Sequence, residues 1–293
     1  MIWPTLANAG DSLGSLQLGG FFLPARFAQE GYCDLVYMQE QQGNMESVYW
    51  AVAFGAIVAG FVQGLSGFAF GMVAMSCWAW FLEPQLAAVL AVCGAWTGQM
   101  IAAFTRRRTS YWQILLPFLF GGLLGVPLGT YLLPFLDAAV FKAFLGTLMV
   151  VWCPIMLMSS RLGHVRVHSR LANALAGLMG GVMGGLGGMT GVIPTLWTTM
   201  TGLPQDEQRA VIQNFNLATL SVTLLAYIAS GSIVPSMLPS IGLVMLAVLM
   251  PVLAGARLYV GISQSTFRAI VLSLLTLSGV AMLLSSVPVL LAR

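Results

Sequence analysis

The stretch Gly60–Gly71 reads GFVQGLSGFAFG, and a second stretch, Gly177–Gly191, reads GLMGGVMGGLGGMTG. Both lie inside long apolar segments, at about 50–81 and 171–203. Glycine lets the backbone leave helical geometry. Backbone without helical hydrogen bonds is tolerated at membrane depth only where it packs on protein or lines a cavity. The two stretches therefore predict a pair of broken or re-entrant helical hairpins inside an all-α membrane protein.

The composition of the whole chain is that of a polytopic membrane protein. Of the 293 residues, 58% are hydrophobic and 7% are charged, and the mean hydropathy is +0.89. Soluble domains carry about 25% charged residues, so lipid must cover part of this apolar surface. The four cysteines, at positions 33, 77, 93 and 153, form no CxxC pair, which argues against a disulfide framework or a zinc site.

The first 45 residues differ from the rest of the chain. Five of the nine acidic residues lie within the first 46 positions. Residues 1–44 contain no apolar run long enough to span a bilayer and lack the basic region of a signal peptide. Either they form an extramembrane arm, or translation starts at Met45. We expect a polar extension over 1–45, a first membrane repeat over 46–162 and a second over 163–293.

Eight apolar segments follow this extension. Six of them suit a single crossing of about 20 residues, whereas the first and fifth are longer and are broken by glycine. The segments lie at about 50–81, 85–105, 111–133, 140–160, 171–203, 208–230, 236–258 and 268–291.

Shifts along the sequence align the first four segments with the last four. The offsets grow in one direction, as small loop insertions would produce, which favours an internal duplication over chance matches in a glycine-rich chain. A shift of 117 places Gly60, Gly64, Gly67, Gly71 and Trp80 on Gly177, Gly181, Gly184, Gly188 and Trp197. A shift of 122 places Ala88 and Thr97 on Ala210 and Thr219, and one of 126 places Gly129, Phe141 and Lys142 on Gly255, Phe267 and Arg268.

Basic loops orient the two halves. After Val48 the chain has eleven basic and four acidic residues, an excess typical of cytoplasmic loops, and we do not expect nucleic-acid binding. If Arg106–Arg108 and the Arg257–Arg268 loop both face the cytoplasm, segment 171–203 must begin and end there as a re-entrant hairpin. Segment 50–81 would then dip from the outside. Each half has one hairpin and three crossings, so the halves are inverted, a recurring transporter plan. Eight simple crossings in parallel halves are the alternative.

Polar side chains inside the apolar segments mark a candidate substrate site. Half-helix N-termini at the glycine breaks would present free N–H groups and a positive dipole end, which suits a small anion. Buried amides and hydroxyls are costly unless they are paired, so hydrogen bonding between helices is the simpler role for each. The candidate substrate-binding residues are Gln63, Ser66, Gly67, Thr97, Gln99, Gly188, Thr190, Arg209, Gln213, Asn214, Asn216 and Thr219.

Two other function classes have weaker support. Glu83 and Asp137 lie near segment ends, which argues against a proton pump built on membrane carboxylates. The tetrad GLSG over 64–67 matches the GxSG form of rhomboid intramembrane proteases, but such a serine needs a base. His164 and His168 both lie in a basic loop. We therefore expect no enzyme, no catalytic residue, no cofactor and no metal site. A coupling proton or sodium ion and a homo-oligomer stay open.

Four blocks together point to a family. They are GFVQGLSGFAFGMVAM, its echo GLMGGVMGGLGGMTGVIPTL, and the downstream GGLLGVPLGTYLL and LAGARLYVGIS. With these blocks the chain resembles the TauE/SafE sulfite exporters (the TSUP permeases) over about residues 48–290. In that family the second copy often reads GxGGG before a proline, whereas here residues 187–194 read GGMTGVIP.

The resemblance implies a multi-pass permease of the bacterial cytoplasmic membrane. Its substrate would be a small anion, often one that contains sulfur, such as sulfite or an organosulfonate. We expect alternating access between the two repeats, with a channel-like anion pathway as the alternative.

Overall fold

The computed structural model describes the backbone of residues 17–18, 21–22, 25–105, 111–158, 169–258 and 264–291, and side chains over 46–105, 111–158, 169–258 and 269–291. The chain divides into two compact units, Met1–Trp50 and Ala51–Arg293. In the first unit, strands β1 (Gln17–Leu18) and β2 (Phe21–Phe22) form an antiparallel pair. Everything that follows concerns the second unit, apart from the start of α1.

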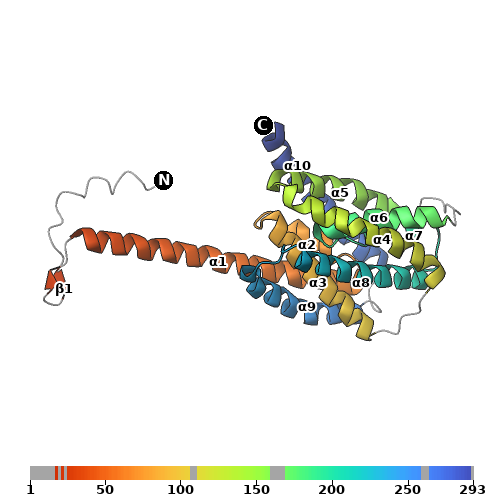
Figure 1. The fold of residues 1–293 in the computed structure, drawn as a ribbon, viewed down its shortest axis with the longest axis horizontal. Helices are drawn as coiled ribbons and strands as arrows, with labels where there is room; N and C mark the ends of the chain where they lie inside the picture. Colours follow the sequence, from red (N-terminus) through yellow and green to blue (C-terminus); the bar gives the residue numbers. More distant parts are fainter. Residues whose placement is uncertain are drawn as a thin grey trace. The chain divides into compact units, whose positions relative to one another are not determined.

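The described membrane unit is helical throughout, and its elements match the eight predicted apolar segments (Figure 1). Seven segments of the described chain are long and apolar enough to cross a bilayer, which confirms an all-α polytopic membrane protein. The helices are α1 (Ala25–Ser66), α2 (Phe70–Trp78), α3 (Pro84–Thr105), α4 (Trp112–Leu132), α5 (Ala138–Met158), α6 (Arg170–Gly187), α7 (Val192–Met200), α8 (Gln205–Ala229), α9 (Leu238–Leu258) and α10 (Gln264–Leu291), with short 3-10 helices η1 (Leu133–Phe135) and η2 (Pro235–Met237).

Both predicted glycine breaks are present. Helix α1 ends at Ser66, and Gly67 follows with φ +86°; α6 ends at Gly187, and Gly188 follows with φ +70°. A side chain disfavours this left-handed region, so glycine suits both positions. The hairpin arms are unequal, because α2 and α7 have nine residues each, whereas α6 has 18. The first arms approach a full crossing, and the second arms reach about half of one.

The two halves repeat the same order of elements, but the shift of 117 is wrong by one helical turn. The breaks at Gly67 and Gly188 lie 121 positions apart, and α2 and α7 begin 122 apart. Helices α4 and α9 are offset by 126 at both ends. Packing agrees with the offset of 121, because a side chain at Gly129 would meet Val182 and Gly185 and one at Gly255 would meet Phe61 and Gly64.

Glycine contacts bring α4 and α6 together in the same direction. A side chain at Gly121 would meet the backbone of Ala174, and one at Gly129 would meet the backbone of Val182. Residue numbers rise together along both helices, so α4 and α6 run parallel. Close approach of this kind is how small residues stabilise helix pairs in lipid, where dispersion replaces the hydrophobic effect.

The counterpart pair, α1 and α9, is built in the same way. Gly60 packs near Val248, and Gly64 packs against Val252, so these helices also run parallel. By contrast, α3 and α8 run antiparallel, because Trp96 bonds Ser221 while the earlier Gln85 bonds the later Ser232.

Corresponding helices of the two halves therefore run in opposite directions. Helix α3 runs parallel to α1, since Gln63 bonds Ala95 and Gln99 bonds Gly67. Helix α8 runs parallel to α4, because Phe118 of α4 meets Phe215 of α8 edge-on and the later Gly122 approaches the later Thr219. One group thus contains α1, α3 and α9, and their respective counterparts α6, α8 and α4 form the opposing group. An inverted repeat predicts this arrangement.

These directions gather the basic helix ends at one end of the bundle. The last turns of α3 and α9, the latter with Arg257, lie there with the first turns of α4, α6 and α8. Arg170 begins α6, and α8 carries Asp206 and Glu207 in its first turn and Arg209 directly after it. We call this end of the bundle the arginine end, and the opposite end, which holds Glu83, the far end. The loops over 106–110, 159–168 and 259–263, with the predicted Arg106–Arg108 and both histidines, lie outside the described residues.

Candidate functional site

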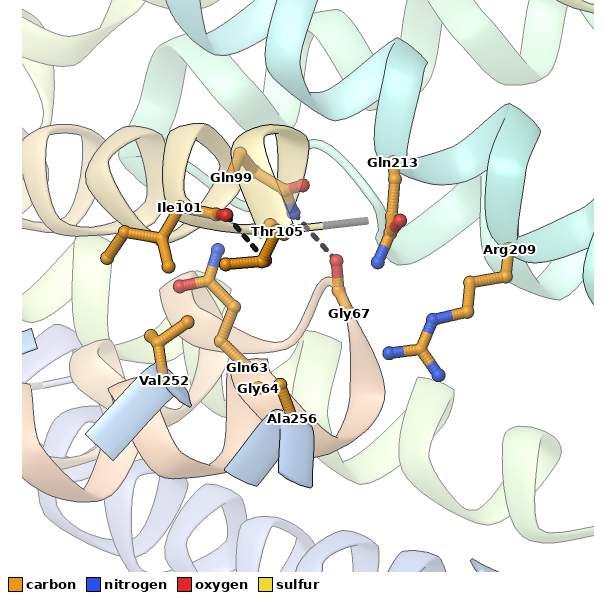
Figure 2. Close-up of a pocket in the computed structure, with 12 residues that line it drawn as sticks. Gln63, Gly64, Gly67, Gln99, Ile101, Thr105, Arg209, Gln213, Val252 and Ala256 are labelled. Atoms are coloured by element: carbon orange, nitrogen blue, oxygen red, sulfur yellow. Dashed lines mark hydrogen bonds between the residues drawn. The ribbon is translucent and has the colours of Figure 1, made fainter. Parts of the chain in front are cut away.

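A narrow pocket lies toward the arginine end, beside the break after α1 (Figure 2). Four elements contribute to it: the end of α1 with its break, the last turns of α3, the start of α8 and the end of α9. The lining residues are Gln63, Gly64, Gly67, Gly98, Gln99, Ile101, Ala102, Thr105, Arg209, Gln213, Val252 and Ala256.

Two glutamines clasp the break to α3. Gln63 Nε2 donates to the carbonyl of Ala95 at 2.9 Å, and Gln99 Nε2 donates to the carbonyl of Gly67 at 2.7 Å. The side chains are 3% and 1% exposed. Because the break frees backbone groups from helical bonding, a buried amide that binds the Gly67 carbonyl removes a cost of about 1–3 kcal/mol. The clasp therefore fixes the shape of the break and joins it to α3.

The missing side chain of Gly67 makes room for two polar groups of α8. A Cβ at Gly67 would lie 3.0 Å from Gln213 Nε2 and 3.8 Å from Arg209 Nε. In Figure 2 both side chains reach from α8 toward the break. Arg209 is the charged residue among the described lining. It is half-buried, so its charge acts at lower dielectric than on the surface.

The mouth of the pocket continues into basic sequence. Thr105 and Ala256 line the pocket, and the residues that follow them are Arg106 and Arg257. Arg257 is exposed at the arginine end.

The second break lies against the first. A Cβ at Gly71, in the first turn of α2, would lie 2.7 Å from the carbonyl oxygen of Gly188. Trp152 of α5 donates from Nε1 to the carbonyl of Val192 at 3.0 Å. Its ring meets that of Phe68 edge-on, with the two ring centroids 6.3 Å apart. The two glycine breaks thus lie together inside the bundle.

These contacts and the pocket are the geometry that a family assignment has to fit. A family model described as "Sulfite exporter TauE/SafE" matches residues 52–282. The chain belongs to the TauE/SafE family. No curated protein and no solved structure matches it. The matched range includes every residue that lines the pocket, and the family is one of membrane transporters.

The pocket of this TauE/SafE protein contains five of the twelve predicted site residues. Ser66 lies directly before the break, where its hydroxyl accepts from the backbone N–H groups of Phe68 and Ala69 at 3.4 and 3.2 Å. It therefore binds backbone N–H groups of the break that precedes α2. The five residues that line the pocket are Gln63, Gly67, Gln99, Arg209 and Gln213.

The remaining predicted residues lie outside this pocket, and most of them belong to the second break. Thr190 donates to the Asn216 carboxamide oxygen at 2.9 Å, and Gly188 forms the break itself. Thr97 donates to the carbonyl of Cys93 at 2.8 Å. Thr219 is fully buried and Asn214 is half-buried. On α8, positions 209, 213 and 216 share one face, with Asn216 further along the helix at the second break, whereas 214 lies on another face.

Sequence reasoning missed seven of the lining residues. Ala102 and Thr105 follow Gln99 at helical spacing, so the face of α3 that holds Gln99 could have indicated them. Gly98 admits the carboxamide of Gln63, which leaves no room for a side chain there. Gly64 belongs to the glycine-rich stretch of the first break, and nothing in the sequence distinguishes Ile101, Val252 and Ala256 from ordinary packing residues.

Proposed function

We propose that this TauE/SafE protein is a permease for a small, singly charged oxyanion, which is either hydrogen sulfite or an organosulfonate. The observation that carries the proposal is the half-buried guanidinium of Arg209 beside the break at Gly67, in a pocket whose other described lining residues are neutral. One guanidinium compensates one negative charge. A second charge in the same pocket would lack a partner and would pay a desolvation cost.

Arginine is well matched to such a substrate. Its planar N–H donors can bind two oxygens of one sulfonate at once, which a lysine cannot do. The amide of Gln213 lies on the same side of the break and can supply a further donor. The described lining residues include no carboxylate, so in this proposal a coupled proton would travel on the substrate.

We place the arginine end in the cytoplasm of a bacterial cell, because basic loops are retained there during insertion. The pocket would then be reached from inside. Movement between two halves whose helices run in opposite directions would expose the same site to the outside.

The test is uptake of methanesulfonate and of sulfite into proteoliposomes, with Arg209→Gln, Arg209→Lys and Arg170→Gln as variants. Hydrogen bonds to charged groups are worth about 1.5–3 kcal/mol, so Arg209→Gln should raise the KM about 10- to 100-fold, with Arg209→Lys intermediate. Arg170 is exposed at the same end, on the first turn of α6, so Arg170→Gln serves as the control for general surface charge.

Sulfite gains a second negative charge as the pH rises past neutrality, whereas methanesulfonate does not change. Uptake of sulfite should therefore fall from pH 6 to pH 8.5 while that of methanesulfonate stays level. Equal uptake by wild type and Arg209→Gln would refute the proposed site. A flux that does not saturate would favour the channel-like alternative.

A further inference from the structure

The seam between α3 and α8 is bridged by hydrogen bonds along much of its length and reaches the pocket toward the arginine end. Near the far end, Gln85 Nε2 donates to the carbonyl of Ser232 at 3.0 Å. Further along, Trp96 Nε1 donates to the hydroxyl of Ser221 at 3.0 Å. The pocket begins two residues later, at Gly98. At 1.5 Å per residue, the closed stretch from position 85 to 96 is about 16 Å long.

The second break seals the middle of this stretch. A Cβ at Gly188 would lie 3.2 Å from the backbone of Ala91 and Val92, so the break and α3 are in close contact. Under the offset of 122, Ala91 is the counterpart of Gln213, and Ala87 is the counterpart of Arg209. The chain thus borders one break with an arginine and a glutamine, and the other with two alanines.

Hydrogen bonds attach each break to a different helix. The glutamine clasp joins the first break to α3. The second break is joined to α8, because Thr190 binds Asn216 and Tyr227 Oη donates to the carbonyl of Gly185 at 2.7 Å. Separation of α3 from α8 would therefore leave each hairpin attached to its own helix.

We propose that the α3–α8 seam over residues 85–96 is the gate that closes the far end, held by Gln85–Ser232, Trp96–Ser221 and the close approach of Gly188 to the backbone of Ala91 and Val92. This proposal rests on the permease function proposed above. The gate opens by breaking these two hydrogen bonds and this close contact, and the pocket then connects to the far end.

The native thiol of Cys93 reports on the gate. It lies between Ala91 and Trp96 and is 4% exposed, so a small alkylating reagent can reach it only when the seam opens. Cys153 lies on α5, away from the seam, and is fully buried, which makes it an internal control. The measurement is the rate of iodoacetamide labelling of each cysteine in the full chain, in nanodiscs without substrate, resolved by peptide mass spectrometry.

Trp96→Phe keeps an aromatic ring, although a smaller one, and removes the donor to Ser221. The loss of one hydrogen bond should raise the open fraction, and with it the labelling rate of Cys93, about fivefold. The matched control is Trp197→Phe, which loses a bond of the same kind, from Nε1 to Asn173 Oδ1 at 2.7 Å, inside the second half. It should leave the Cys93 rate unchanged.

Gln85→Met removes the other seam bond and should also raise the Cys93 rate, so the result does not depend on a single variant. An unchanged Cys93 rate in both seam variants would overturn the gate, as would an equal rise in Trp197→Phe or an equal rise at Cys153. The assay needs no substrate, so a failure of Arg209 variants to affect uptake would refute the anion site without altering the labelling result.

Discussion

The packing of the second hairpin on α4 can be tested by adding a single methyl group. Gly185 is buried on α6, and a Cβ there would lie 2.6 Å from Thr130 N and 2.8 Å from Gly129 C. Ordinary contact begins at 3.4 Å. Both neighbours are backbone atoms that cannot rotate away, so in Gly185→Ala the two helices must separate by about 0.8 Å.

Gly242→Ala is the matched control, because Gly242 lies inside α9 and a Cβ there would have nothing within 4 Å. Alanine is favoured over glycine inside a helix by about 0.5–1 kcal/mol, and both variants gain this term. Their difference therefore isolates the strain, which we take as about 2 kcal/mol. For a protein of this size, about 2 kcal/mol corresponds to a melting temperature that is about 4–8 °C lower for Gly185→Ala than for Gly242→Ala.

The assay is the loss of the monodisperse peak on size exclusion after heating at one fixed rate, since membrane proteins commonly unfold irreversibly. Gly242→Ala should melt at or above the wild-type temperature. If Gly185→Ala melted together with Gly242→Ala, the close α4–α6 contact, and with it the offset of 121 that it supports, would be wrong.

Two further substitutions test the pocket through uptake. Gln99→Met removes the donor to the Gly67 carbonyl and should raise the KM about tenfold. Gln113 lies on the exposed first turn of α4, so Gln113→Met should leave the KM unchanged. Equal effects of the two variants on the KM would rule out a role of the Gln99–Gly67 bond in uptake. Gly67→Ala strains a φ of +86° by about 1–2 kcal/mol and crowds the α8 side of the pocket, so uptake should fall. Gly231→Ala has φ +69° with nothing within 4 Å, so it carries the same backbone strain and should leave uptake intact; a parallel loss would show that strain alone is responsible.

The sequence predicts the breaks because only glycine adopts their backbone geometry readily, but it does not determine their register. Gly60, Gly64 and Gly67 are spaced so that a shift of 117 or of 121 places each of them on another glycine. The two alignments differ by one helical turn, which preserves the face of each helix. Only a contact between helices, such as that of Gly255 with Gly64, distinguishes them.

The polar residues of the site could be predicted from the sequence, but the position of each one in the helix bundle could not. A buried amide is costly wherever it lies, so composition identifies Gln63, Gln99 and Asn216 without distinction. The structure assigns the first two to the pocket and the third to Thr190 at the other break. That division depends on which helix faces which, and hydropathy does not contain this information.

An internal duplication makes the two breaks equivalent, whereas a single anion site requires them to differ. The sequence differences between the halves are consistent with the second requirement. A duplicated chain begins with two equivalent breaks. If both were bordered by arginine, two charges would lie close together in a low-dielectric interior, and the far end would need water to solvate one of them. With Ala87 and Ala91 in the first half, and Arg209 and Gln213 in the second, the permease that we propose has one break that would bind the anion and one that would seal the path. In this proposal the difference between the halves, rather than their similarity, gives a closed permeation path with a single binding site.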